Sequence, residues 1–241
     1  MQPTISHQMM GYDRTSAMFS PDGRMLQVEY AKKAIKGGAT SLGMVCKDGV
    51  VLLADRKVTD ELMEMKSIQK IFQVDDHIGA SATGYLMDGR VLIERAQLLA
   101  QQYRITYDSP IDVLNIVKEI SNVKQVYTQL GGARPFGVSI LFAGIDEDGP
   151  KLFMTDVTGM YYQYKATAIG EAETQIKDTL IKSYKEGVIT VDQGIRLGLE
   201  ALKKALGKDF GIEKIDGMYI KTDDMKFVRL DKEYFKKILK A

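Results

Sequence analysis

The chain has 241 residues, of which 45% are hydrophobic and 27% are charged, enough for one large domain with a substantial core. Thirty-three basic residues face thirty-two acidic ones, and a net charge of +1 argues against a general grip on nucleic acid or on an anionic membrane. One cysteine, Cys46, and two distant histidines, His7 and His77, argue against a disulfide framework and against zinc sites, so no metal or cofactor is expected.

Neither a membrane span nor a secretory signal is expected. The longest apolar run, 138–145, is far shorter than the roughly 20 residues that a membrane-spanning helix needs. The first residues lack the basic and apolar regions of a signal peptide. We therefore expect a cytoplasmic protein.

The N-terminal residues differ in character from the rest of the chain. Residues 1–19 have no helical or strand period and are interpreted as a mobile arm, although a frayed end without a role is the alternative. Ser20-Pro21-Asp22-Gly23 predicts a turn, because proline presets the backbone of the second turn position. A helix is expected over 24–36, ended by Gly37-Gly38. Its apolar stripe consists of Met25, Val28, Ala31 and Ile35.

Two blocks of strands, each followed by a pair of helices, make up most of the remaining chain. The first block has expected strands at 40–46, 50–55, 68–74 and 78–82, and helices at 85–104 and from Pro110 to about 129, the latter capped by Ser109. The second has expected strands at 136–143, 151–156, 160–164 and 166–169, and helices at 172–186 and 190–206. A capping box opens the last of these at Thr190 and Gln193. A hairpin at 218–221 and 227–230 and a helix at 231–240 follow.

This order of elements predicts the fold class. Each strand block is expected to be antiparallel and to carry its helix pair on one face. Two sheets that are each covered by helices on one outer face must bury their other faces against each other. We therefore expect an α/β (α+β) protein, a four-layer helix–sheet–sheet–helix sandwich. It forms a single domain over residues 20–241, with an extra N-terminal helix.

Two patterns suggest catalysis only weakly. The glycine spacing of 84–90 imitates a phosphate loop, but Arg90, Val91 and Asp88 stand where that loop needs lysine, a hydroxyl group and room for phosphate. His77 beside Asp76 could act as a general base, although a solvated turn is the interpretation we favour. The chain also has no Gly-x-Ser-x-Gly motif for a serine hydrolase.

A third pattern concerns an acid and a lysine. Asp55 and Lys70 each lie at the end of a strand, and the two strands are expected to be adjacent, so the residues could pair. A purely structural ion pair is the alternative. Upstream stands Gly37-Gly38-Ala39-Thr40. Cleavage after a glycine that frees a nucleophilic residue is the N-terminal-nucleophile scheme, in which the free amine serves as the base.

Several segments together carry a family resemblance. They are Tyr12-Asp13-Arg14, Phe19-Ser-Pro-Asp-Gly-Arg24, Gln27-Val-Glu-Tyr-Ala31, Gly49-Val-Val-Leu-Leu-Ala-Asp55, Ile68-Gln-Lys-Ile71, Tyr127-Thr-Gln129, Arg134-Pro-Phe-Gly-Val138 and Lys165-Ala-Thr-Ala-Ile-Gly170. In this order, over roughly residues 9–235, the chain resembles the proteasome α-subunits of the archaeal kind, which build homomeric rings. The resemblance implies the four-layer sandwich of the N-terminal-nucleophile hydrolases.

The resemblance also implies that the chain has no catalytic residue. In the related β-subunits, a threonine freed by self-cleavage opens the first strand. Aligned on Gly43, that position falls on Ala39, while the acid falls on Asp55 and the lysine, with one gap, on Lys70. A methyl group cannot attack a carbonyl, and the preceding segment stays attached. An active N-terminal-nucleophile hydrolase that is cut elsewhere, and a free-standing scaffold domain, are the alternatives.

The resemblance implies a role in enclosing and gating. Seven such subunits form the outer ring on β-subunit rings that hold the peptidase sites, and the N-terminal arms restrict the entry of unfolded proteins. The implied gate residues are Tyr12, Asp13, Arg14, Pro21 and Tyr30. The implied docking residues for the C-terminal tails of a ring ATPase or another activator are Lys70, Gly84 and Tyr85. The helix at 24–36 is expected to pack between neighbouring subunits, the alternative being that its stripe covers its own sheet.

Overall fold

Ten strands in the described residues, 11–57 and 62–240 of this computed structural model, pair into two antiparallel sheets of five strands. The first sheet has the order β10-β9-β2-β1-β8 and contains β1 (Ser41–Cys46), β2 (Gly49–Asp55), β8 (Ala166–Ile169), β9 (Ile215–Lys221) and β10 (Phe227–Arg229). The second sheet has the order β3-β4-β5-β6-β7 and contains β3 (Ile71–Asp75), β4 (Ile78–Gly84), β5 (Val138–Asp146), β6 (Gly149–Thr155) and β7 (Tyr161–Gln163).

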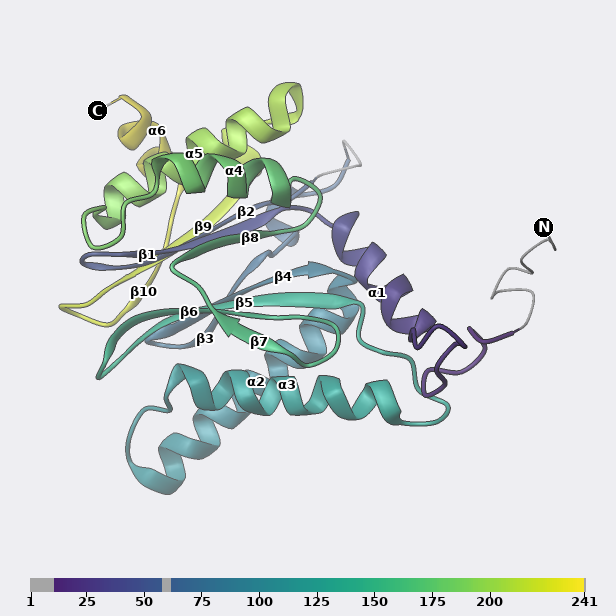
Figure 1. The fold of residues 1–241 in the computed structure, drawn as a ribbon. Helices are drawn as coiled ribbons and strands as arrows, with labels where there is room; N and C mark the ends of the chain where they lie inside the picture. The colour runs from purple at the N-terminus through teal and green to yellow at the C-terminus, as the bar shows by residue number, and fades with distance from the viewer. Residues whose placement is uncertain (1–10, 58–61, 241) are drawn as a thin grey trace.

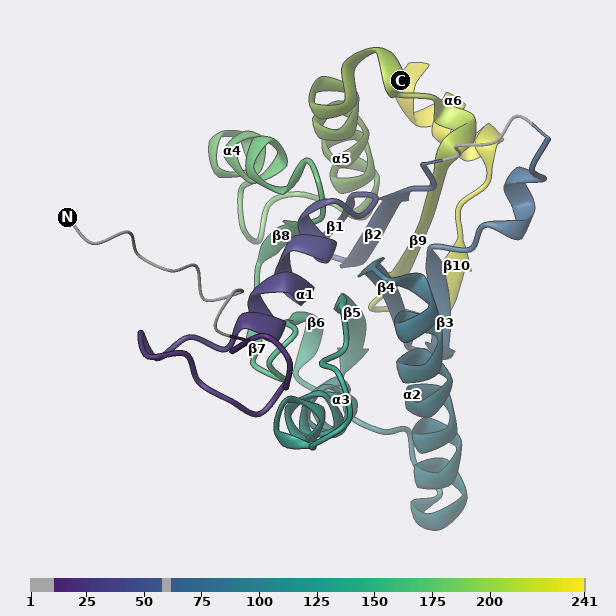
Figure 2. The same ribbon diagram turned by 90° about the vertical axis from the view of Figure 1, so that its right-hand side faces the viewer.

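Helices cover the outer face of each sheet (Figure 1). The first sheet is covered by α4 (Glu173–Ser183), α5 (Val191–Leu206) and α6 (Lys232–Lys240), and the second by α2 (Leu86–Tyr107) and α3 (Val113–Gln129). Short 3₁₀ turns lie at Met65–Ser67, Gly207–Asp209 and Ile212–Lys214. The remaining helix, α1 (Leu26–Lys36), runs across one end of the sandwich, as Figures 1 and 2 show. The predicted four-layer architecture is confirmed.

Three apolar layers hold these four layers together, and β2 shows why. All seven residues of β2 are buried, because a strand between two layers has no face left for water. Val50, Leu52 and Ala54 pack in the central layer against the other sheet. Val51 and Leu53 alternate with them and pack under the helices of the first sheet. The central layer therefore depends on the two-residue period of the strands.

The division of strands between the sheets differs from the sequence prediction. The two strand blocks do not each form one sheet, because each block is split between the two sheets. β1 and β2 join β8, β9 and β10, whereas β3 and β4 join β5, β6 and β7. Long-range pairing decides this division: β1 pairs with β8 through Ser41 and Ile169, and β4 pairs with β5 through Thr83 and Ser139.

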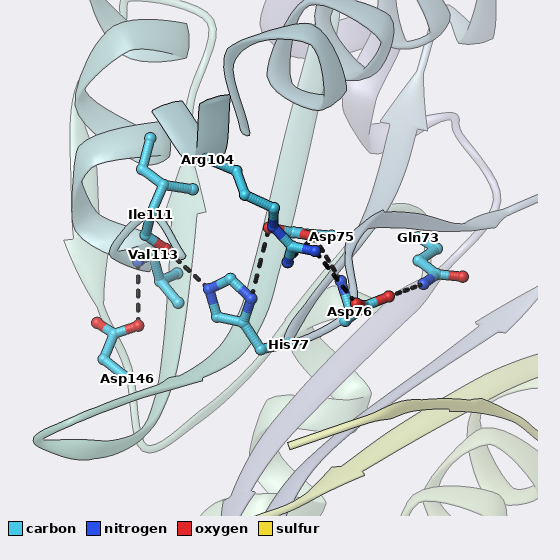
Figure 3. Close-up of polar contacts among 8 residues, drawn as sticks. All are labelled: Gln73, Asp75, Asp76, His77, Arg104, Ile111, Val113 and Asp146. Carbon is cyan, nitrogen blue, oxygen red and sulfur yellow. Dashed lines mark hydrogen bonds and ion pairs between the residues drawn. The ribbon is translucent and has the colours of Figure 1, made fainter. Parts of the chain in front are cut away.

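Local sequence signals correctly predicted most element ends, but the predicted cap of α3 at Ser109 was wrong. The capping box is present, with the Gln193 amide donating to Thr190 Oγ1 and the Gln193 side chain accepting from the Thr190 amide. However, α3 begins at Val113 rather than after Ser109. The Val113 amide donates to Asp146 Oδ1 of β5 at 3.1 Å, so a carboxylate from a distant strand replaces the expected local cap (Figure 3).

Candidate functional site

The helix α1 is seated on its own subunit. It packs against β4 and β5, and Val28, Ala31 and Ile35 of the predicted stripe are buried together with Leu26, whereas Met25 is half-buried. Three of these residues form a small cluster with Val157 from the turn between β6 and β7. For the stripe, the alternative given above is therefore correct: it covers the helix's own subunit. The opposite face of α1 exposes Lys32, Lys33 and Lys36, and its place in a ring stays a prediction.

A tight turn leads into α1. The Gly23 amide donates to the Ser20 carbonyl at 2.8 Å, which places Pro21 at the second turn position as predicted. The Ser20 amide in turn donates to the Arg24 carbonyl at 2.9 Å. Gly23 has φ +72°, a conformation that favours glycine. The turn therefore fixes the direction from which the preceding segment approaches the helix.

The implied gate residues meet where the N-terminal segment touches α1. The Tyr30 hydroxyl donates to Asp13 Oδ2 at 3.4 Å. The Gln27 side chain donates to the Asp13 carbonyl. Tyr12 beside it is half-buried, whereas Arg14 is exposed. Gln27 was not singled out from the sequence, although it belongs to a quoted motif. The part of the arm at residues 1–10, with His7, lies outside the described residues.

The end of β4 brings the three implied docking residues together. Gly84 ends the strand with φ +114°, and a Cβ there would lie 2.2 Å from the Gly137 carbonyl oxygen, so any side chain would clash. Tyr85 follows with a half-exposed ring. Lys70 is 1% exposed, and its amine donates at 2.6 Å to the carbonyl of Ala82, two residues before Gly84. Lys70 therefore points into its own subunit.

Electrostatics around Lys70 involve two carboxylates. Burial lowers the pKa of Lys70 from 10.5 to about 8, against the opposing effect of Asp55 and Asp216. Asp55 and Lys70 are not on adjacent strands, contrary to the sequence prediction, because β2 and β3 belong to different sheets. Burial raises the pKa of Asp55. A hydrogen bond from the backbone of Lys57 and the positive charges of nearby lysines oppose this rise.

Asp216 is a structural residue that no sequence pattern had indicated. Its carboxylate, 1% exposed, accepts hydrogen bonds from the backbone amides of Lys70 and Ile71 and contacts Arg56 at 3.2 Å and Arg229 at 3.1 Å. It thus joins both sheets where β3 begins. No local sequence signal marks it, because its partners are separated by up to 160 positions in the sequence.

The strand-opening region lacks a nucleophile at the expected position. Ala39 presents a methyl group, and its carbonyl accepts a hydrogen bond from Thr83 Oγ1 at 3.0 Å. The neighbouring Thr40 is 1% exposed, and its hydroxyl accepts from the Ala172 amide at 3.0 Å. The Thr40 hydroxyl therefore supports the start of α4 and is not presented to a substrate.

The two remaining candidates have structural partners. His77 is buried rather than solvated, which corrects the sequence interpretation. Its Nε2 bonds the Ile111 carbonyl at 2.8 Å and its Nδ1 faces Asp75, not Asp76, at 3.6 Å (Figure 3). Arg104 holds the other Asp75 oxygen at 2.8 Å. This network ties the β3–β4 turn to the helix pair α2 and α3.

In the segment that imitates a phosphate loop, Asp88 occupies the first turn of α2 and is bound by Arg134 and by the Gly137 amide. An internal carboxylate therefore fills the place that a phosphate would take. Within 11–57 and 62–240 there is no group of three or more His, Cys, Asp or Glu residues that could hold a metal ion. In the same ranges no helix has both the length and the apolar character to cross a membrane.

The four-layer sandwich, with Ala39 at the strand-opening position, is that of the proteasome-type subunits. The family model described as "Proteasome subunit" matches residues 35–220 of this chain. A second model, described as the N-terminal signature of the A-type proteasome subunits, matches residues 12–34, which contain the turn and most of α1.

Named relatives agree with these matches. The proteasome α-subunit of Methanocaldococcus jannaschii is 47% identical over 95% of this chain and 87% of its own length. The proteins of that description from Archaeoglobus fulgidus and Methanosarcina acetivorans are each 46% identical, over 94% and 93% of this chain and over 92% and 90% of their own lengths. The chain belongs to the proteasome α-subunit family.

Proposed function

We propose that this chain is a non-catalytic structural and gating subunit in the outer, seven-membered ring of a proteasome core particle. It assembles with copies of itself and with β-subunits that carry the peptidase sites. Unfolded proteins are the substrates in transit. Its arm restricts their entry, and the C-terminal tails of a ring ATPase or another activator dock beside Gly84 and Tyr85. The methyl group of Ala39 supports the absence of catalysis.

The observation that carries the gating role is the base of the arm. Asp13 is held against α1 by Tyr30 and Gln27, in the segment that leads to the turn at Pro21. Because α1 closes one end of the sandwich, any segment attached to its start is positioned by the rigid fold beneath it. A few polar contacts hold the segment there, so an activator can shift it at modest cost.

Truncation of the arm tests this function. Rings assembled with β-subunits from a chain lacking residues 1–11 should stay intact and should hydrolyse unfolded protein faster than the full-length assembly. Hydrolysis of a small peptide should rise as well, because entry and not bond cleavage is limiting. An unchanged rate for unfolded protein would show that the arm is merely a chain end.

Asp13→Ala is the matched point variant. It should assemble and should keep basal hydrolysis low, yet it should fail to hold the open arrangement when an activator is added. Intact-mass measurement of the chain in the same assemblies addresses the alternative of an active hydrolase. Loss of a segment that ends near Gly38 would reveal self-cleavage and overturn the non-catalytic assignment.

A further inference from the structure

Arg134 joins segments that meet at the start of α2. Its guanidinium donates two hydrogen bonds to the Asp88 carboxylate, at 2.6 and 2.7 Å, and lies 5.7 Å from the centre of the Tyr85 ring. Asp88 also accepts from the Gly137 amide at 2.8 Å, and the Tyr85 amide donates to the Gly137 carbonyl at 2.9 Å. Both the ring and the backbone of Tyr85 are therefore tied to the loop between α3 and β5.

The chemistry of this unit requires arginine. Burial by itself raises the pKa of Asp88, but the hydrogen bonds from Arg134 and Gly137 outweigh burial and lower the pKa below its usual value. Asp88 therefore stays ionised near neutral pH. The planar guanidinium engages both carboxylate oxygens with parallel bonds, whereas the ammonium of a lysine acts as a point charge and cannot reproduce that geometry.

The same loop supports the base of the N-terminal arm. A cleft of about 350 Å³ lies between arm residues 14–16 and loop residues 132–134, with Gln27 of α1 in its wall. Ser16 is buried, and its hydroxyl donates to the Leu130 carbonyl at 3.2 Å. Figures 1 and 2 both show the N-terminal segment beside the loop that follows α3. Arg134 thus faces Tyr85 on one side and borders the arm cleft on the other.

We propose that Arg134 is a positioning residue that transmits a displacement of Tyr85 to the base of the N-terminal arm. The inference rests on the proposed docking of activator tails at Gly84 and Tyr85. A tail that moves the Tyr85 ring also moves the guanidinium, because both belong to the unit anchored by Asp88. Movement of Arg134 moves the loop between α3 and β5, and Ser16 is hydrogen-bonded to that loop at Leu130. The competing explanation is that Arg134 and Asp88 only stabilise the start of α2 and have no influence on the arm.

The test uses the core particle assembled from this chain and its β-subunit. Met18, which is exposed in the arm base, is replaced by cysteine and carries a spin label. Cys46 stays unlabelled, because it is buried and burial raises the pKa of its thiol to about 12. Arg134→Lys retains the charge but loses the paired geometry. Arg90→Lys is the matched control, because Arg90 lies on the exposed face of α2 and only approaches Glu94 at 3.6 Å.

Three quantities are measured. Binding of a fluorescent peptide with a tyrosine near its free C-terminal carboxylate reports docking, with the C-terminal amide of the same peptide as its control. Hydrolysis of an unfolded protein reports opening, and label mobility reports the arm base. Arg134→Lys should bind the peptide within about twofold of the original core, while the peptide-induced mobility change and stimulation fall about tenfold. Arg90→Lys should behave like the original.

Full stimulation in Arg134→Lys would overturn the inference, and so would a loss of peptide binding in proportion to stimulation, which would make Arg134 a docking residue. If the original core does not bind the peptide, the docking proposal fails by itself. The link between Arg134 and the arm base is then tested without peptide. Arg134→Lys should increase the mobility of the spin label, and unchanged mobility would overturn the proposed link. If Arg134→Lys does not assemble, Asp88→Asn replaces it with the same expected outcomes.

Discussion

Two lysines are buried in different regions of the molecule, and their surroundings differ in a way that bears on function. Lys124 lies on α3 against the second sheet and is fully buried. Its amine donates to Val138 O at 2.9 Å, to Thr155 Oγ1 at 2.8 Å and to Asp156 O at 3.0 Å. When Lys124 is protonated, these three bonds use all three N–H groups of its ammonium. Lys124 therefore has no donor left for a further partner.

Lys70 lies where β3 begins, between the two sheets, and is buried to the same extent. Among the described residues, its amine has one hydrogen-bonded acceptor, Ala82 O, against three for Lys124. Asp55 and Asp216 act on it electrostatically. An ammonium with unused N–H groups can still donate a hydrogen bond to the carboxylate of an incoming tail. Hydrogen-bond saturation, rather than burial, thus distinguishes the two lysines, and docking stays a prediction for Lys70.

Lys124 also contacts the segments on which α1 packs. Val138 begins β5, Thr155 ends β6, and Asp156 opens the turn that carries Val157 under α1. Lys124 therefore connects α3 to the surface on which α1 rests. Removing it should affect global stability first and the position of α1 second.

The largest effect is expected for Lys124→Ala. The substitution leaves a cavity and takes the donor from three buried acceptors, so the free energy of unfolding should fall by about 2–5 kcal/mol. Urea denaturation measures this. Lys118→Ala on the exposed face of α3 is the control and should stay within about 0.5 kcal/mol. A loss below about 1 kcal/mol for Lys124→Ala would contradict the structural role.

The next effect is a pH dependence. Burial lowers the pKa of Lys124 from 10.5 to about 7, so between these values the folded state holds fewer protons than the unfolded state. Stability therefore rises with pH across this window, falls as the pH is lowered from 10.5 towards 7, and levels off below about 7, where both states hold the proton. Lys124→Met removes this contribution, and from about pH 7 to pH 9 the difference should shift in favour of the original chain, by at most about 1.4 kcal/mol per pH unit. Urea midpoints at several pH values measure it, and a constant difference would argue against a titrating Lys124.

A smaller stability effect is expected for Lys70→Met. One hydrogen bond to Ala82 is lost, so the free energy of unfolding should change by less than about 1.5 kcal/mol. In assembled rings, stimulation by an activator tail should disappear while basal peptide hydrolysis persists. The opposite pattern, a large stability loss with normal tail binding, would assign Lys70 to a purely structural pairing with Asp55.

The smallest effect is expected for Tyr30→Phe. The bond from its hydroxyl to Asp13 is long, at 3.4 Å, so global stability should change by no more than about 0.5 kcal/mol. Amide hydrogen exchange should nevertheless become faster over residues 11–19 and stay unchanged in α3. Equal exchange in the arm base would show that the Tyr30 hydroxyl does not hold Asp13 in place.

Much of the local structure could be predicted because its causes lie within a few residues. The turn at Pro21 and the capping box at Thr190 and Gln193 depend on neighbouring backbone groups, and both are present. The start of α3 was misplaced because its cap is Asp146, which lies 33 positions away from Val113. Nothing in the local sequence favours this carboxylate over the hydroxyl of Ser109.

The candidate site divides in the same way. Sequence motifs pointed to Asp13 and Tyr30, and the structure places them in contact. Arg134 also belongs to a quoted motif, but its bonds to Asp88, 46 positions away, depend on how the loop after α3 folds against the start of α2. Asp216 had no signal, since a lone acid in a strand does not indicate that two arginines from other segments will surround it.

The sequence by itself determined the periods, the turns and the locally made caps of the elements, and from them the four layers, because amphipathic sheets and helices must bury their apolar faces. The tertiary structure alone decided how the strands divide between the two sheets, since β1 must choose between partners whose local patterns are alike. It also decided that α1 rests on Val157, that His77 is buried, and that Lys124 is saturated while Lys70 is not. These outcomes depend on contacts between distant segments, whose geometry is fixed only when the whole core closes.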